Sequence, residues 1–131
     1  MTTGYVAALR NAQLDAITTF VGNGGKVQLY TASRPATGGT ATTALVNVFT
    51  CGSPFAPAAS GGVLSPTLPA ASTGSAAGTA AWFRLFKTDG TTICIDGSVG
   101  TSAADMIVNT TTISIGVAVS ITAWTITRGN P

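Results

Sequence analysis

The chain has 131 residues, of which 45% are hydrophobic and only 8% are charged, and its formal net charge is +2. Its six Lys and Arg residues are scattered, without the basic cluster that nucleic-acid binding uses, so we expect no nucleic-acid partner. Mean hydropathy is +0.43, yet no uninterrupted apolar stretch reaches the roughly 18 residues of a membrane span, and no signal peptide is evident. We therefore expect no membrane partner, and the length indicates one domain, residues 1–131.

The first predicted element is an N-terminal α-helix at about residues 3–21. Apolar side chains recur there at the helical period, which is typical of an amphipathic helix with one core-facing stripe. That stripe is built on Val6, Leu9, Gln13, Ile17 and Phe20. The opposite, polar side carries Arg10, Asn11, Asp15 and Thr18. The glycine-rich segment 22–25 then ends the helix.

From Lys26 onward the pattern changes to β-strands. The predicted strands span residues 26–32, 44–51, 63–68, both arms of a hairpin within 80–101, 105–109, and 111–127 with a bend near Gly116. A total of about eight strands after one helix predicts an all-β fold. We expect an antiparallel β-sandwich or jelly roll over about residues 26–128, preceded by the one N-terminal α-helix.

The rest of the chain is organised around the hairpin at Ala80–Thr101, where two runs of aromatic and β-branched residues flank Asp89-Gly90. A two-residue loop would mix polar and apolar side chains on both faces. A three-residue loop, Thr88–Gly90, avoids this and is the register that we favour. It places Phe83, Leu85, Ile93 and Ile95 on one face. The other face then carries Trp82, Arg84, Phe86, Cys94 and Asp96, with a diagonal pair between Arg84 and Asp96.

Trp82, Arg84 and Phe86 are the candidate interface residues, because aromatic side chains and arginine often anchor protein contacts. Two other interpretations stay open. The helix or a second sheet covers this face in one of them. In the other, the aromatic rings form a platform on which a carbohydrate stacks.

The residues of catalytic chemistry are scarce, since the chain has no histidine and only four carboxylates. Asp15 lies on the predicted helix and Asp89 in a turn, so only Asp96 and Asp105 could meet through folding. The segment 22–26 lacks the spacing of a phosphate-binding loop, and no cluster has the spacing of metal ligands. We expect no catalytic residues, no cofactor or metal site, and no enzyme activity.

Cys51 and Cys94 are the only cysteines, and both lie beside apolar residues. We interpret them as buried free thiols. A disulfide between them stays open, because two cysteines allow one pairing.

Several segments resemble a group of small virion proteins encoded beside the head genes of tailed bacteriophages. The matching segments are Leu9–Ala16 (LRNAQLDA), Leu29–Ala36 (LYTASRPA), Ala58–Gly62 (AASGG), Gly78–Arg84 (GTAAWFR), Asp96–Gly100 (DGSVG) and Asn109–Thr111 (NTT). They are spread over most of the chain. The chain looks like a capsid decoration (cement) protein, a class that often has compact β-sandwich or jelly-roll folds.

This resemblance implies a structural protein of the phage head, made in the host cytoplasm, whose partners are the major capsid protein and further copies of itself. It supplies no catalytic or ligand-binding residues. Binding at many identical lattice points would turn a modest affinity into a large avidity. The alternatives are a minor head–tail component and a carbohydrate-binding or adhesion module of a tail or fibre that uses Trp82 or Trp124. A hydrolase that depends on Asp96 and Asp105 is a third, weaker hypothesis.

Overall fold

The computed structural model describes residues 3–130. Within them it has one helix, α1 (Ala7–Val21), and eleven strands. The strands are β1 (Lys26–Thr31), β2 (Leu45–Thr50), β3 (Val63–Leu64), β4 (Ser72–Thr73), β5 (Gly78–Phe86), β6 (Ile93–Gly100), β7 (Met106–Val108), β8 (Thr112–Ile113), β9 (Ala118–Val119), β10 (Ile121–Trp124) and β11 (Ile126–Thr127). The prediction of a mostly β chain with one N-terminal helix is confirmed.

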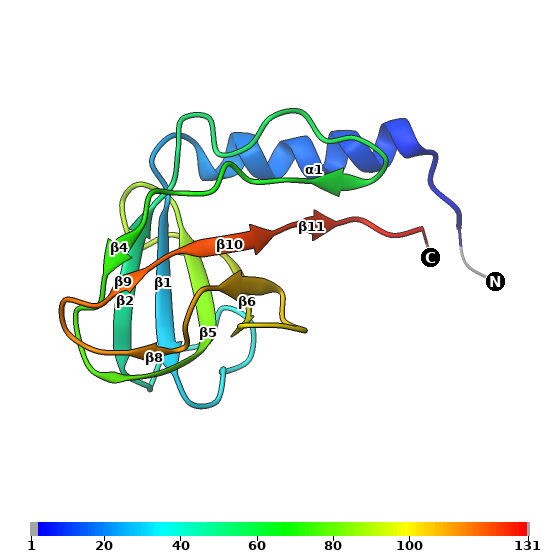
Figure 1. Cartoon of the computed structure of the whole chain (residues 1–131). Helices are drawn as coiled ribbons and strands as arrows, with labels where there is room; N and C mark the ends of the chain where they lie inside the picture. The colour runs from blue at the N-terminus through cyan, green and yellow to red at the C-terminus, as the bar shows by residue number, and fades with distance from the viewer. Residues whose placement is uncertain (1–2, 131) are drawn as a thin grey trace.

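The main sheet has the strand order β10-β7-β6-β5-β1-β2, and β8 pairs with the start of β5. All pairs of neighbouring strands in this sheet are antiparallel except β6 and β7, which are parallel. The sheet curls into a half-barrel, and the two small pairs β3–β11 and β4–β9 lie beside it (Figure 1). A sandwich or jelly roll, the finer form of the prediction, stays a prediction.

The core fills the inside of this curl. Its largest fully buried side chains come from β1, β2, β5 and the segment after β2, and they include Leu29, Phe49, Phe55, Phe83 and Leu85. Trp124 of β10 packs edge-on against both Phe55 and Phe83, with ring centroids 5.5 and 5.3 Å apart. These three rings join the last long strand to the centre of the sheet.

The predicted 111–127 strand is broken into short pieces. Gly116 has a φ of +81°, a left-handed conformation that glycine adopts without strain, and it turns the chain between β8 and β9. The expected bend at this glycine is therefore confirmed. Its consequence is larger than expected, because β8, β9, β10 and β11 pair with four different strands.

The helix is rotated about its axis from its predicted orientation, and of the five predicted stripe residues only Ile17 packs against the core. Val6, Leu9 and Phe20 are 72%, 45% and 50% exposed, whereas the two helical side chains that are buried are Leu14 and Val21. The polar side lies against the segment before β3 instead. There, the carboxylate of Asp15 accepts a hydrogen bond from Ala59 N–H, and the side-chain oxygen of Asn11 accepts one from Gly62 N–H. The polar side turned inward because it provides acceptors for backbone groups that would otherwise be left unpaired.

The N-terminal part of α1 extends past the curled sheet, and together with β3 and β11 it forms an arm that carries both ends of the described chain (Figure 1). Tyr5 N–H donates a hydrogen bond of 2.8 Å to the side-chain oxygen of Asn130, so the two ends are tied together. Arg128 links the arm to the helix, because its Nε donates to Gln13 and its carbonyl accepts from Arg10.

The hairpin register also differs from the favoured one. Arg84 lies opposite Asp96 and Leu85 opposite Ile95, and a bulge then brings Phe86 opposite Ile93. The predicted three-residue loop is wrong, because Lys87 N–H bonds Thr92 C=O and closes a longer loop. The bulge directs Cys94 toward the core, where the prediction had placed Ile93.

Candidate binding site

The predicted interface residues Trp82, Arg84 and Phe86 lie on one face of β5 and are only 1%, 3% and 8% exposed. The chain itself covers them. Tyr30 of β1 stacks on the Trp82 ring with centroids 4.4 Å apart and planes inclined by 13°. The Arg84 guanidinium lies over the same Trp82 ring, 5.2 Å from its centroid.

Over Trp82 and the Arg84–Asp96 pair, the cover is the segment between β1 and β2, residues 32–44. Trp82 Nε1 donates to the carbonyl of Thr31 and to the hydroxyl of Thr43 at 3.2 and 3.1 Å. Gly38 N–H donates to the carboxylate of Asp96 at 2.9 Å. A contact between this face and a partner stays a prediction, and it would require the covering segment to move away.

Beneath this cover, Arg84 and Asp96 form a buried ion pair with two hydrogen bonds of 2.7 and 2.9 Å. The hydrogen bond to Asp96 raises the pKa of Arg84. Burial by itself would raise the pKa of Asp96, but hydrogen bonds from Arg84 and Gly38 outweigh burial and hold that pKa below its ordinary value. Both side chains are therefore ionised at neutral pH.

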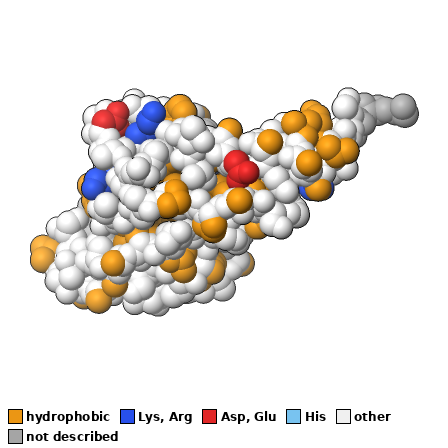
Figure 2. Space-filling model, turned by 90° about the horizontal axis from the view of Figure 1, so that it is seen from above, with side chains coloured by type: hydrophobic (Ala, Val, Ile, Leu, Met, Phe, Trp, Pro, Cys, Tyr) orange, Lys and Arg blue, Asp and Glu red, His pale blue; other side chains and the backbone are white. Residues whose placement is uncertain are grey.

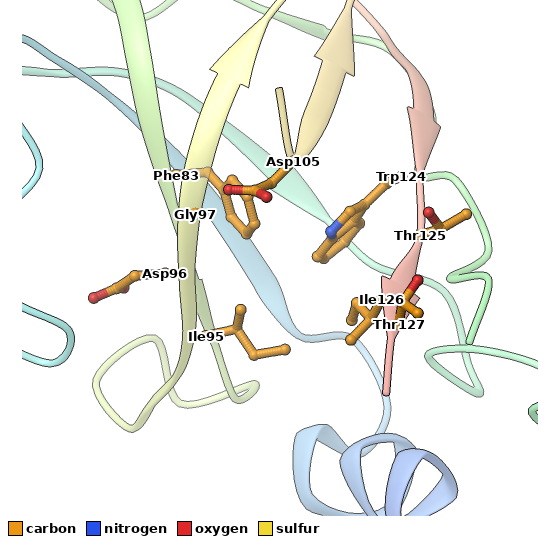
Figure 3. A pocket seen from close by; sticks show the side chains of 9 residues that line it. All are labelled: Phe83, Ile95, Asp96, Gly97, Asp105, Trp124, Thr125, Ile126 and Thr127. Atoms are coloured by element: carbon orange, nitrogen blue, oxygen red, sulfur yellow. The ribbon is translucent and has the colours of Figure 1, made fainter. Parts of the chain in front are cut away.

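On the other face of β5 and β6 lies a pocket of about 240 Å³ (Figure 3). It is lined by Phe83, Ile95, Asp96, Gly97, Asp105, Trp124, Thr125, Ile126 and Thr127. One wall is thus β6, and the opposite wall is the end of β10 with β11. Phe83, Ile95, Trp124 and Ile126 direct apolar atoms into it.

Asp105 stands at one end of the pocket. Its Oδ2 accepts hydrogen bonds of 2.8 Å from Ser98 N–H and 2.9 Å from the Ser98 hydroxyl. These hydrogen bonds lower the pKa of Asp105. Asp96 contributes only backbone to the pocket, because its side chain points away toward Arg84. Asp96 and Asp105 therefore do not form a pair of carboxylates facing one space.

Trp124 forms the floor of the pocket and is 4% exposed, so its ring offers no open stacking platform. Figure 3 shows its indole nitrogen turned toward the space between β6 and β11. No residue among 3–130 accepts a hydrogen bond from this nitrogen. The pocket therefore has an indole N–H donor directed at its interior.

The sequence drew attention to Trp124 only as a possible platform, and it gave no reason to place Trp124 beside Phe83. The sequence did contain one indication of where the Phe83 ring lies, the glycine of the Asp96-Gly97-Ser98 segment. Gly97 lies opposite Phe83, and a Cβ there would be 2.5 Å from the Phe83 ring, so this glycine marks where the ring crosses β6.

Residues 3–130 offer neither a metal site nor a membrane-spanning helix. They contain no group of three or more His, Cys, Asp or Glu side chains placed to hold a metal ion. Their single helix is too short and insufficiently apolar to cross a membrane. Cys51 and Cys94 are both free thiols, the first buried and the second half-buried. Comparison with protein-family models, with curated protein sequences and with solved structures finds no match.

Proposed function

We propose that this protein is a structural protein of a tailed-phage virion, a decoration (cement) protein that binds the outer surface of the head and stabilises the capsid lattice. Support comes from the resemblance of segments spread over most of the chain. The observation that carries the proposal is the outward-facing side of α1, which is suited to a neighbouring protein.

We define the outer helix face as the exposed side chains of α1 and the residue before it. Its large apolar members are Val6, Leu9 and Phe20, and the residues between them are mainly alanines. The helix has only two charged residues, Arg10 and Asp15, and both bond the body of the protein. Seen from above, hydrophobic side chains gather toward the far end of the arm (Figure 2).

An amphipathic helix normally buries its apolar stripe, and large exposed apolar patches mark interaction sites. The outer helix face has three large apolar side chains, Val6, Leu9 and Phe20. Such a surface suits binding at many repeated positions, where modest single contacts add up through avidity. In this proposal the β-domain is a β-sandwich or jelly roll that also contacts further copies of itself on the lattice.

The test compares capsid occupancy of purified protein added to heads that lack it, measured by sedimentation and cryo-electron microscopy. Leu9→Glu and Phe20→Glu should abolish or strongly reduce occupancy. Ile115→Glu is the matched control, since Ile115 is an apolar side chain that is 77% exposed in the turn between β8 and β9, two strands that lie away from the arm (Figure 1). All three variants should keep the wild-type denaturation midpoint. Detection of the protein only in tails, or equal binding by all variants, would refute the proposal.

A further inference from the structure

The half-barrel is incomplete at the pocket, because two strand edges face each other there without a partner. β6 pairs with β5 over residues 93–98, but its other side pairs with β7 only at Val99 and Gly100. Ser98 N–H points away from β5 to Asp105, so the backbone groups of Asp96, two residues earlier, point the same way. Within the described chain no strand pairs with this side of residues 95–98.

The second edge belongs to β11. Ile126 pairs with Leu64 of β3, and Arg128 N–H donates to the carbonyl of Gly62 on the same side. The backbone groups of Thr127 therefore point the other way, into the pocket that Thr127 lines. Unpaired strand edges are templates for an additional strand.

The side chains around the space between the edges match a peptide in chemistry. Trp124 Nε1 faces the pocket and makes no hydrogen bond within residues 3–130, and it suits a peptide carbonyl. Asp105 Oδ1 accepts no hydrogen bond from the described residues, whereas Oδ2 is occupied by Ser98, so Oδ1 suits a peptide N–H. Ile95 and Ile126 form apolar walls that suit one aliphatic side chain.

We propose that the cleft between β6 and β11 binds an extended, uncharged segment of a partner protein as an added β-strand, with one aliphatic side chain in the pocket. The strand would connect β6 to β11 and complete the barrel. Main-chain hydrogen bonds supply the affinity in such strand addition, and the side-chain pocket supplies the selectivity. A sugar is a weaker match, because the walls are two isoleucines and the aromatic floor is nearly covered. This site is independent of the outer helix face.

In the test, the capped peptide acetyl-Thr-Val-Thr-Val-Thr-amide is titrated into the ¹⁵N-labelled full chain, and binding is followed by ¹⁵N NMR. Only two indole N–H signals exist, from Trp82 and Trp124. The peptide should shift the Trp124 signal in a saturable manner. It should leave the Trp82 signal in place, because that N–H is already bonded to Thr31 and Thr43. Peptides N-methylated at one of the valines should include one that binds about tenfold more weakly, the loss expected for one hydrogen bond.

Two variants distinguish the contribution of the backbone hydrogen bonds to binding from the contribution of the pocket. Thr127→Pro removes the N–H on the edge of β11 and should abolish binding, since proline cannot donate to a strand. Trp124→Phe keeps a ring but removes the donor, and it should weaken binding about tenfold, read from the backbone signals of residues 95–98. If the Trp124→Phe variant does not fold, the results with Thr127→Pro and with the N-methylated peptides still decide whether the peptide binds as an added strand. Three results would overturn the proposal: no peptide shift, an equal shift with methyl glucoside, or a Trp124 shift that depends on protein concentration alone and indicates a second copy.

Discussion

Arg84 and Asp96 lie directly opposite each other on β5 and β6, and two hydrogen bonds of 2.7 and 2.9 Å join their buried side chains. The pair also fixes the covering segment, because the same carboxylate accepts Gly38 N–H. Arg84, which was predicted as an interface residue, therefore makes an internal contact: it holds Asp96 in place, and Asp96 binds the covering segment.

The first prediction concerns the loss of the arginine. Arg84→Met should lower the free energy of unfolding by about 3–5 kcal/mol, because it leaves the buried Asp96 carboxylate without its counter-charge. Urea denaturation at neutral pH measures this. The double variant Arg84→Met with Asp96→Leu should recover a large part of the loss, since it removes both buried charges. A single variant as stable as wild type would show that the pair contributes little.

The second prediction concerns pH. Asp89, Asp96 and Asp105 all have pKa values below the ordinary value, and hydrogen bonds from Thr92 and Thr91 lower the pKa of Asp89 to about 2. A carboxylate whose pKa is lower in the folded than in the unfolded state stabilises the fold. Its contribution is fully present at a pH above the unfolded-state pKa of about 4, and it is lost as the pH falls toward the folded-state pKa. The chain has no histidine, so stability should stay flat between about pH 5 and pH 8 and fall below about pH 4.

Denaturation midpoints across this pH range provide the measurement. Asp105→Asn should lower stability at neutral pH and flatten the acid slope, because the amide does not titrate. A midpoint that rises on acidification would contradict the assigned directions.

The sequence predicted those parts of the fold that follow from local patterns. The N-terminal helix, strands β1 and β2, the hairpin and the bend at Gly116 all carry a periodicity or a turn residue that acts over a few positions. The pairing of β10 with β7, and of β11 with β3, joins distant segments that no local pattern specifies.

The two main errors have one physical origin. Amphipathic periodicity places the apolar side of a helix on the core, but here Asn11 and Asp15 bind backbone N–H groups of Gly62 and Ala59. The favoured loop length ignored Asp89, which accepts hydrogen bonds from Thr91 and Thr92 and stabilises a longer turn. In both places a polar side chain that satisfies the backbone decided the outcome. The pocket was not predicted either, because it arises from pairings between distant segments.

The third prediction concerns the thiols. Cys51 is 5% exposed, and burial raises its pKa to about 11, so very little thiolate exists near neutral pH. Cys94 is half-buried, and burial raises its pKa as well. An aromatic disulfide reagent should label Cys94 first, and Cys51 should react only as the protein opens. The variant Cys94→Ser should lose the fast phase. Fast labelling of both thiols, or of neither after unfolding, would contradict free thiols of unequal access.

The last prediction concerns Gly97, where Phe83 crosses β6. A Cβ at Gly97 would lie 2.5 and 2.8 Å from two carbons of the Phe83 ring and 3.2 Å from Asp105 Oδ2. Gly97→Ala should therefore lower the free energy of unfolding by about 1–3 kcal/mol, because the ring is packed against Trp124 and cannot move without disturbing the pocket floor. Gly129→Ala is the control, since nothing lies within 4 Å of its added Cβ and it should change stability little. Equal effects of the two variants would show that Phe83 can shift freely. A larger effect at Gly97, together with a shifted Trp124 indole signal, would show that this glycine sets the position of both rings and so the shape of the cleft.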